Sequence, residues 1–345
     1  MCQLYLGDTN SYATTPPNPF WTNPSIQSPS YTFVADGTAY PINVVLQKAD
    51  TNTGCSAALI ELYWSDPTTS FLLESANAVP PTGIAVQPIA AKLTFSPDDA
   101  STTFPFTWTP DASIAGIHGG HVCLAAIASC TTTSDGCVAP APSSPGSTAA
   151  TTNAQVAIHN TQVNLPPPGP MKRIWPFFFG AANGGGIPGL TRLVARAYNP
   201  DNEDDRIHLL NLAALPAVRA AYGRCLKFGT PAEVHLALGA ESVVVPPAQK
   251  GGRGGRLGYT GAVTPELADH LVKRSWAKAV GHAPVTKEFD LIPRQVQQAG
   301  VYVTPREEDG RIYAIEIGHE LIAKGASPVL LGGLTVLFAA PCRPW

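Results

Sequence analysis

Short segments in which apolar and polar residues alternate recur along the first half of the chain. They cover residues 31–34, 40–47, 57–64, 103–108, 121–128 and 154–163. Successive side chains of a β-strand point to opposite faces, so a period of two indicates strands with one face in a core. Phe104, Phe106 and Trp108, for example, share one face. Turn signals such as Asp36-Gly37 separate the segments, and the pattern predicts an antiparallel sandwich.

The second half repeats this pattern and contains one helical segment. Its strand-like segments cover residues 190–199, 206–212, 232–238, 242–245, 311–317 and 330–339. Residues 264–280 begin with Thr264, Pro265 and Glu266, which are helix start signals, and Gly281 would end the helix. We therefore predict a mainly β fold of two tandem Ig-like antiparallel β-sandwich domains, the second with an inserted helix at about residues 265–280.

Charge and proline content support a division near residue 165. Residues 1–170 hold 2 of the 22 Lys and Arg and 10 of the 25 Asp and Glu, a net charge of −8, whereas residues 171–345 hold 20 and 15, a net charge of +5. Either the two surfaces simply differ, or the acidic face of one copy meets the basic face of another.

The predicted domains follow from these features. They are an extended N-terminal arm at 1–30, a sandwich at 31–165, a Pro-rich linker at 166–170 and a second sandwich-like domain at 171–345.

Residues 18–165 resemble a known family in several core and turn motifs. These are PFWTNPSI at 19–26, IELYWSDP at 60–67, FTWTP at 106–110, HVCLAA at 121–126 and NAQVAIHN at 153–160. The stretch resembles bacterial Ig-like domains of the CARDB type, an adhesion-like sandwich family. Because the motifs are core and turn residues, the resemblance implies a fold and says little about function.

The seven cysteines leave both compartment and connectivity open. A Cys130–Cys137 disulfide would close a short Ser/Thr-rich loop and contribute about 2–3 kcal/mol. The spacing of His118, His121 and Cys123 allows a zinc site. Since free cysteine is commonly buried in a core, we expect no metal there. Cys55 would pair with Cys2 or with nothing.

Two charged segments have simpler interpretations than ligand binding. The acidic segment 201–205 lacks the spacing of a calcium loop, so we expect a solvated hairpin turn. The segment 250–256 is a single RGG-type element, and nucleic-acid binding by such segments needs repeats with interleaved aromatic residues. We therefore expect a flexible basic loop, or one that orders against an acidic neighbouring subunit, and no nucleic-acid partner.

No motif in the sequence assembles a catalytic site. The nucleophile motif Gly-x-Ser-x-Gly is missing, and the histidines have no Ser or Cys nucleophile at a motif spacing. We expect no enzyme, no catalytic residue, no cofactor and no metal. No apolar run is long enough to span a membrane, and the N-terminus lacks the pattern of a standard signal peptide.

The remaining features favour a protein that acts by association. Aromatic residues in the N-terminal arm need a surface to cover, either on their own domain or on a neighbour. The expected function is that of a non-enzymatic structural or assembly subunit of a virion surface layer or extracellular filament, with copies of itself or other subunits as partners. The alternative is adhesion, or binding of a carbohydrate or surface ligand through sandwich-end loops, with Trp64 or Trp276 in a groove. An extracellular or virion-surface location fits both. The expected assembly contacts are Phe20, Trp21, Arg253, Arg256 and Trp276.

Overall fold

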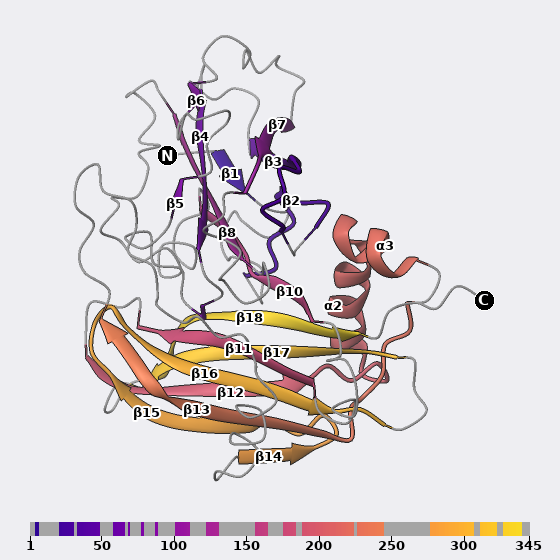
Figure 1. Cartoon of the computed structure of the whole chain (residues 1–345), viewed down its shortest axis with the longest axis vertical. Helices are drawn as coiled ribbons and strands as arrows, with labels where there is room; N and C mark the ends of the chain where they lie inside the picture. The colour runs from indigo at the N-terminus through magenta and orange to yellow at the C-terminus, as the bar shows by residue number, and fades with distance from the viewer. Residues whose placement is uncertain are drawn as a thin grey trace.

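The structure contains two β-sandwiches, which lie one above the other in Figure 1. This computed structural model describes residues 4–6, 21–30, 33–48, 58–65, 68–69, 77–78, 87–88, 101–110, 122–130, 156–164, 175–183, 188–223, 226–244, 277–306, 311–322 and 327–339. The prediction of a mainly β fold with tandem sandwiches is confirmed. No helix within the described ranges is long and apolar enough to cross a bilayer.

Two antiparallel sheets make the first sandwich. One sheet has the order β1-β3-β2, with β7 paired to β3, and the other has the order β5-β4-β8-β9, with β6 paired to β4. Their bounds are β1 Leu4–Leu6, β2 Ile26–Gln27, β3 Tyr40–Lys48, β4 Ala58–Ser65, β5 Asn77–Ala78, β6 Gln87–Pro88, β7 Ser101–Trp108, β8 Cys123–Cys130 and β9 Val156–His159. As predicted, Phe104, Phe106 and Trp108 face the core, where the Trp108 ring lies 5.6 Å from that of Trp64.

The described parts of the predicted arm belong to the first sandwich itself. Strand β1 pairs with β3 in the register Leu4↔Lys48, and Leu6 is fully buried in the core. Strand β2 pairs with the same edge of β3 further along, at Ile26↔Val44. Of the two surfaces expected for this segment, its own domain or a neighbour, these residues cover their own domain, because their apolar side chains complete its sheet and core. The extended arm at 1–30 as a whole stays a prediction.

The residues before β3 also differ from the prediction. A strand was expected at residues 31–34, but residues 33–39 form bends and irregular backbone, with Gly37 at a φ of 89°. Phe33 nevertheless packs in the core, with ring centroids 4.9 Å from Tyr40 and 4.7 Å from Trp108. The alternating pattern thus predicts the burial of Phe33 correctly, but the strand conformation that it predicts for this residue is wrong.

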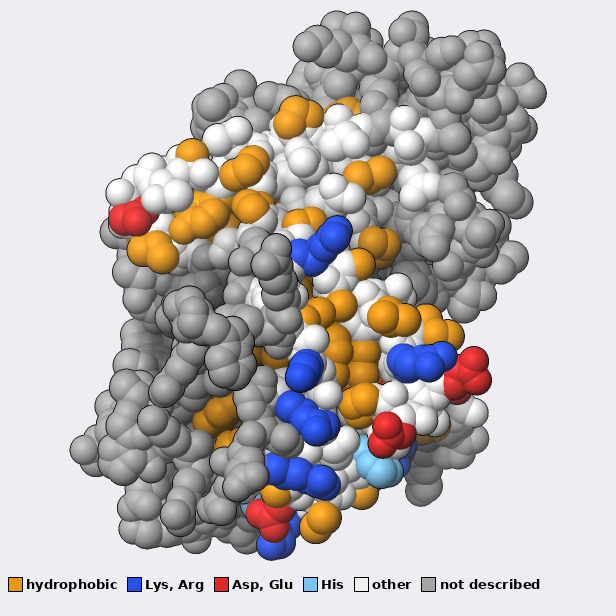
Figure 2. Space-filling model, turned by 90° about the vertical axis from the view of Figure 1, so that its right-hand side faces the viewer, with side chains coloured by type: hydrophobic (Ala, Val, Ile, Leu, Met, Phe, Trp, Pro, Cys, Tyr) orange, Lys and Arg blue, Asp and Glu red, His pale blue; other side chains and the backbone are white. Residues whose placement is uncertain are grey.

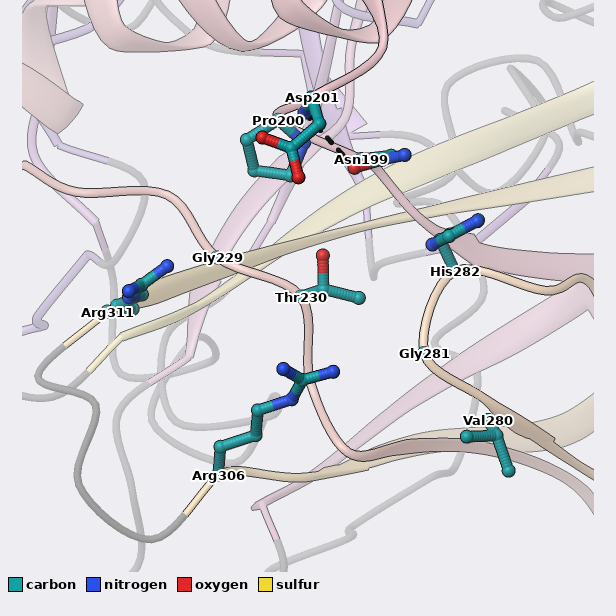
Figure 3. A pocket seen from close by; sticks show the side chains of 10 residues that line it. All are labelled: Asn199, Pro200, Asp201, Gly229, Thr230, Val280, Gly281, His282, Arg306 and Arg311. Carbon is teal, nitrogen blue, oxygen red and sulfur yellow. Dashed lines mark hydrogen bonds between the residues drawn. The ribbon is translucent and has the colours of Figure 1, made fainter.

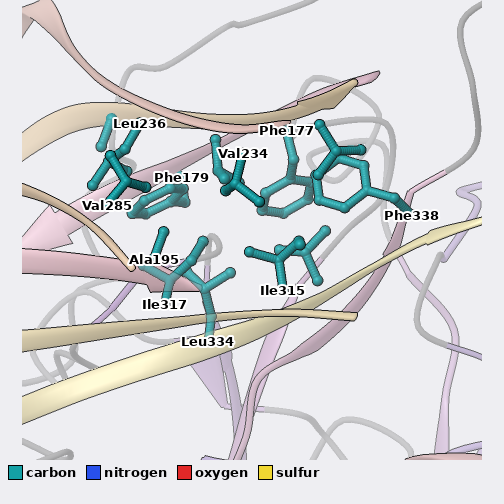
Figure 4. Packing of buried hydrophobic residues seen from close by; sticks show 14 of the residues in the cluster. Phe177, Phe179, Ala195, Val234, Leu236, Val285, Ile315, Ile317, Leu334 and Phe338 are labelled. Atoms are coloured by element: carbon teal, nitrogen blue, oxygen red, sulfur yellow. The ribbon is translucent and has the colours of Figure 1, made fainter. Parts of the chain in front are cut away.

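The second sandwich also has two sheets. Their orders are β10-β18-β17-β12-β15 and β11-β16-β13-β14. Their bounds are β10 Thr161–Asn164, β11 Trp175–Ala182, β12 Gly189–Ala197, β13 Glu233–Val244, β14 Ala277–Val280, β15 Val285–Leu291, β16 Gln295–Thr304, β17 Ile312–Ile322 and β18 Val329–Ala339. Figure 4 shows the core between the sheets, in which Phe177 and Phe179 of β11 face Ile315 and Ile317 of β17.

Two helices replace a predicted strand at residues 206–212. Helix α2 spans Glu203–Ala214 and α3 spans Pro216–Tyr222. Asp205, Leu209 and Leu212 are the buried residues of α2, at a helical spacing, and the two leucines cover β17 and β18 together with α3. The helix predicted at about 265–280 is wrong at its end, because residues 277–280 form β14. Residues 265–276 lie outside the described part of the chain.

The two sandwiches are joined by a chain crossing at Asn160. The single strand predicted at 154–163 is divided there: β9 pairs with β8 in the first sandwich, and β10 pairs in parallel with β18 in the second. The Asn160 amide donates through Nδ2 to the carbonyl oxygens of Thr68 (2.6 Å) and Gly333 (3.0 Å). Its backbone N–H donates to the Trp21 carbonyl, and its carbonyl accepts from the Thr335 N–H. One buried residue thus connects segments of both sandwiches.

Further buried polar contacts extend this junction. Trp21 donates through Nε1 to Thr335 Oγ1 at 3.1 Å. Thr69 donates its backbone N–H to the Gly180 carbonyl, and its Oγ1 lies 2.8 Å from His319 Nδ1. Both Thr69 and His319 are buried. Because buried polar groups need specific partners, such a network holds the two sandwiches in one defined arrangement.

Candidate functional site

A pocket of about 770 Å³ opens at one end of the second sandwich. Strand registers show that the last residues of β12, β14 and β16 and the first residues of β13, β15 and β17 lie at this common end. Figure 3 shows the lining side chains approaching from several loops. The lining residues are Asn199, Pro200, Asp201, Gly229, Thr230, Val280, Gly281, His282, Arg306 and Arg311.

Gly229 positions the Arg311 side chain at one wall of the pocket. The Gly229 N–H donates to the Ile312 carbonyl, and the Ile312 N–H donates to the Lys227 carbonyl. A Cβ atom at residue 229 would lie 2.5 Å from Cδ of Arg311. The aliphatic part of the arginine therefore lies directly over the glycine, and only a residue without Cβ leaves room for it.

Arg306 is anchored through its backbone to a buried tyrosine. Its N–H donates to the Tyr313 hydroxyl at 3.1 Å. Tyr313 is 1% exposed, and its ring centroid lies 5.9 Å from that of Trp175. The Arg306 guanidinium extends from this fixed point toward Thr230 in Figure 3.

A tight turn between β14 and β15 presents His282. Gly281 adopts a φ of 64°, a left-handed conformation that favours glycine, and its N–H donates to the Ala232 carbonyl. The Ala283 N–H closes the turn on the Val280 carbonyl at 3.3 Å. His282 is exposed, and so is Val280, at 71%.

The wall formed by residues 199–201 is held by the start of α2. The Asp205 carboxylate accepts from the Asn199 N–H at 2.8 Å and from the Arg196 guanidinium at 2.8 Å. Arg196 also pairs with Glu316 at 2.8 Å; burial raises the pKa of Glu316, and this arginine opposes the rise. The hairpin turn expected at 201–205 is wrong, because Asn202 is a helix N-cap that accepts from the Asp205 N–H.

The lining side chains suit the binding of an anionic group. Arg306 and Arg311 supply guanidinium groups, which remain charged and match carboxylate or phosphate in a fork geometry. Thr230 and His282 add a hydroxyl and an imidazole, while Asp201 is the carboxylate among the described lining residues. The described residues contain no cluster of His, Cys, Asp or Glu suited to a metal ion. The side chains that line the pocket therefore suit the binding of a negatively charged group.

Two tryptophans proposed from the sequence as contact residues are buried. Trp21 is 2% exposed, because its indole fills the junction beside Gly333, so it offers no surface to another subunit. Trp64, a candidate for a ligand groove, is 7% exposed in the core of the first sandwich. Both expectations are corrected: these aromatic residues stabilise the chain that contains them.

Most of the other predicted site residues lie outside the described part of the chain. This holds for the expected contacts and for the remaining cysteine and histidine candidates, namely Phe20, Arg253, Arg256, Trp276, Cys137, His118 and His121. Cys130 ends β8, and its pairing with Cys137 stays a prediction. Cys123 is a free, fully buried cysteine, and burial raises the pKa of its thiol.

Sequence reasoning missed the pocket residues. Thr230, His282, Arg306 and Arg311 belong to no motif, and they are brought together by strand pairings between distant segments. The sequence did contain a signal for the pocket wall formed by residues 199–201. Asn202 with an acidic residue three positions later is a helix start, which would have replaced the expected hairpin.

Comparisons with known proteins place the chain in no family. No family model matches it, and no curated protein matches it. Among solved structures, the N-terminal domain of PorA aligns with a TM-score of 0.25 at 9% identity, covering 53% of this chain and 91% of that one. The collagen adhesin CNA from S. aureus aligns with a TM-score of 0.25 at 9% identity, covering 91% of each chain. The Enterococcus faecalis protein ACE aligns with a TM-score of 0.22 at 6% identity, covering 92% of this chain and 94% of that one. At these TM-scores the likenesses carry no argument about function.

Proposed function

We propose that this protein acts by association, binding an anionic group of another molecule in the pocket at the end of its second sandwich. The observation that carries the proposal is the convergence of Arg306 and Arg311 with Thr230 and His282 on one open pocket. Arginine does not exchange protons near neutral pH, so Arg306 and Arg311 bind an anionic group and do not serve as acid or base. The role is non-enzymatic.

The fixed backbone around the pocket supports this proposal. Arg306 follows β16, and Arg311 precedes β17, on a frame anchored by Tyr313 and by the contact of Arg311 with Gly229. Binding groups held in place lose less conformational entropy when a ligand arrives. Loops at the end of a rigid sandwich commonly form binding sites in such folds.

The proposal is tested with acetylated tetraglutamate amide as a carboxylate probe in isothermal titration. We expect Arg306→Ala and Arg311→Ala each to weaken binding by about tenfold or more, because each removes a charge-assisted contact. Arg219→Ala is the matched control, since Arg219 is an exposed arginine on α3 that does not line the pocket. Equal binding by all four proteins, or no binding by the unaltered chain, would contradict the proposal.

Two finer assignments accompany this function. We propose that the first sandwich is of the CARDB type, on the motif residues given above. We also propose an assembly role, as in a virion surface layer or filament, because the two halves of the chain carry net charges of −8 and +5. Adhesion to a carbohydrate or surface ligand is the alternative, which the same pocket would serve. An array of anionic glycans probed with the unaltered chain and Arg306→Ala separates it from assembly.

A further inference from the structure

We propose that the occupant of the pocket is the acidic first sandwich of a second copy, so that the protein associates head to tail. The inference rests on the proposed function and names the partner. It follows from where the junction places the first sandwich, from the division of charge, and from the apolar residues beside the pocket.

The junction separates the first sandwich from the pocket of its own chain. The contact of Thr69 with His319 lies far along β17 from the pocket residue Arg311. His319 on β17 and Arg311, which immediately precedes β17, are eight residues apart, about 26 Å along an extended strand. Among the described residues, none from the first half of the chain lines the pocket. Asp201 is the carboxylate among the described lining residues, and we assign the further acidic group to another copy.

The first half of another copy has the required net charge, and Asp36 and Glu61 are its acidic residues within the described part of the chain. Residues 1–170 carry ten acidic and two basic side chains, against fifteen and twenty in residues 171–345. The acidic residues 307–309 connect Arg306 to Arg311 in sequence, and they are included in the fifteen acidic residues of 171–345. The net charge of residues 171–345 is positive with these three residues counted. Opposite net charges favour contact between unlike ends and oppose contact between like ends.

Apolar residues near the pocket favour a protein partner over a small anion or a sugar. Val280 in the pocket wall is 71% exposed, and Ile207 and Leu210 on α2 are 53% and 62% exposed. Helix α2 begins two residues after the pocket residue Asp201. Figure 2 shows this side of the molecule, where apolar side chains lie beside Lys and Arg side chains. Protein interfaces combine such apolar groups with arginine.

A contact between unlike surfaces has a distinctive consequence. A pocket on one copy and an acidic surface on the next make a heterologous interface, which repeats from copy to copy. A variant with a disabled pocket still presents its acidic sandwich. It would therefore occupy the last open pocket of a chain of unaltered copies and end its growth.

Sedimentation velocity of the full chain tests the proposal across protein and salt concentrations. We expect oligomers that dissociate in about 1 M salt, where the screening length falls to about 3 Å. The double variant Arg306→Glu with Arg311→Glu should raise the dissociation constant by about 100-fold or more, since each lost charged contact is worth about tenfold. Added to unaltered protein, it should shorten the oligomers. Arg219→Glu, with the same type of charge change elsewhere, should associate normally.

The outcomes separate this inference from the proposed function. A monomer at every concentration that still binds acetylated tetraglutamate amide would overturn the inference and leave the pocket function in place. Oligomers that the double variant forms equally well would also overturn it. Loss of association without chain shortening in the mixture would indicate a pocket-to-pocket contact, which contradicts a head-to-tail arrangement.

Discussion

Removing the Asn160 side chain should uncouple the two sandwiches. In Asn160→Ala, the carbonyl oxygens of Thr68 and Gly333 lose the donors now at 2.6 and 3.0 Å. Each net hydrogen bond contributes about 1 kcal/mol, and a buried acceptor left without a partner costs about 1–3 kcal/mol. The expected loss in the free energy of unfolding is therefore about 2–4 kcal/mol.

This loss should change the form of thermal unfolding as well as its midpoint. The two sandwiches have separate hydrophobic cores. The junction joins them through its polar contacts and through an apolar cluster in which Leu330 of β18 packs against Trp21 and residues of β8 and β9. For domains of this size, 1 kcal/mol corresponds to about 2–4 °C in Tm. By differential scanning calorimetry we expect one transition for the unaltered chain. Asn160→Ala should give two, with the first lowered by roughly 5–15 °C.

A second buried asparagine supplies the control. Asn183 donates through Nδ2 to the Leu291 carbonyl at 3.2 Å, a contact between two segments of the second sandwich, although the N–H of the neighbouring Ala182 donates to Thr69 Oγ1 at the junction. Asn183→Ala should therefore destabilise that sandwich without separating the transitions. If Asn160→Ala unfolds in one transition at an unchanged Tm, the hydrogen bonds of Asn160 do not couple the sandwiches, and the argument for a rigid junction is refuted.

Three further predictions address the junction and α2. Burial lowers the pKa of His159 to about 4 and of His319 to about 3, from 6.5, so the unfolded chain binds more protons. The free energy of unfolding should be highest above pH 6.5 and should fall as the pH drops toward 4 and 3, by up to about 1.4 kcal/mol per pH unit for each histidine. Tm measured against pH should show this fall, and the slope should be smaller in His319→Gln. Gly333→Ala would place Cβ 2.6 Å from the Trp21 ring and should cost about 1–3 kcal/mol in urea unfolding; no change would refute the tight contact. Asn202→Ala removes a helix cap and should cost about 1 kcal/mol in the same assay, with Asn202→Asp retaining stability.

Alternation along the sequence predicts β3, β4, β7 and β8 of the first sandwich and β12, β13, β17 and β18 of the second. Phe104, Phe106 and Trp108 show why, because one face of a strand against a core imposes a period of two wherever it occurs. Alternation misses β11, β14, β15 and β16, and it does not give the connections between strands. The segment 206–212 shows the limit of this rule. A short stretch that mixes apolar and polar residues fits either period, and the helical choice is made by the N-cap at Asn202 and by packing on β17 and β18.

The junction and the pocket could not be predicted from local patterns. Asn160 sits between the polar residues His159 and Thr161, where nothing in the local pattern marks it, and its partners Thr68 and Gly333 are 92 and 173 residues away. Arg306 and Arg311 become pocket residues only because strand pairing places them beside residues near position 200. Both features consist of long-range contacts between ordinary residues, which carry no periodicity or motif.

The rigid junction and the cationic pocket together determine what kind of assembly could form. A head-to-tail contact applies the same rotation and translation at every step, and it gives a closed ring or an open filament according to that rotation. The step is well defined only if the acidic sandwich keeps one orientation relative to the pocket of its own chain. Asn160 supplies this condition, because it binds segments of both sandwiches within the protein interior. A flexible linker would instead allow many rotations and give a mixture of assemblies.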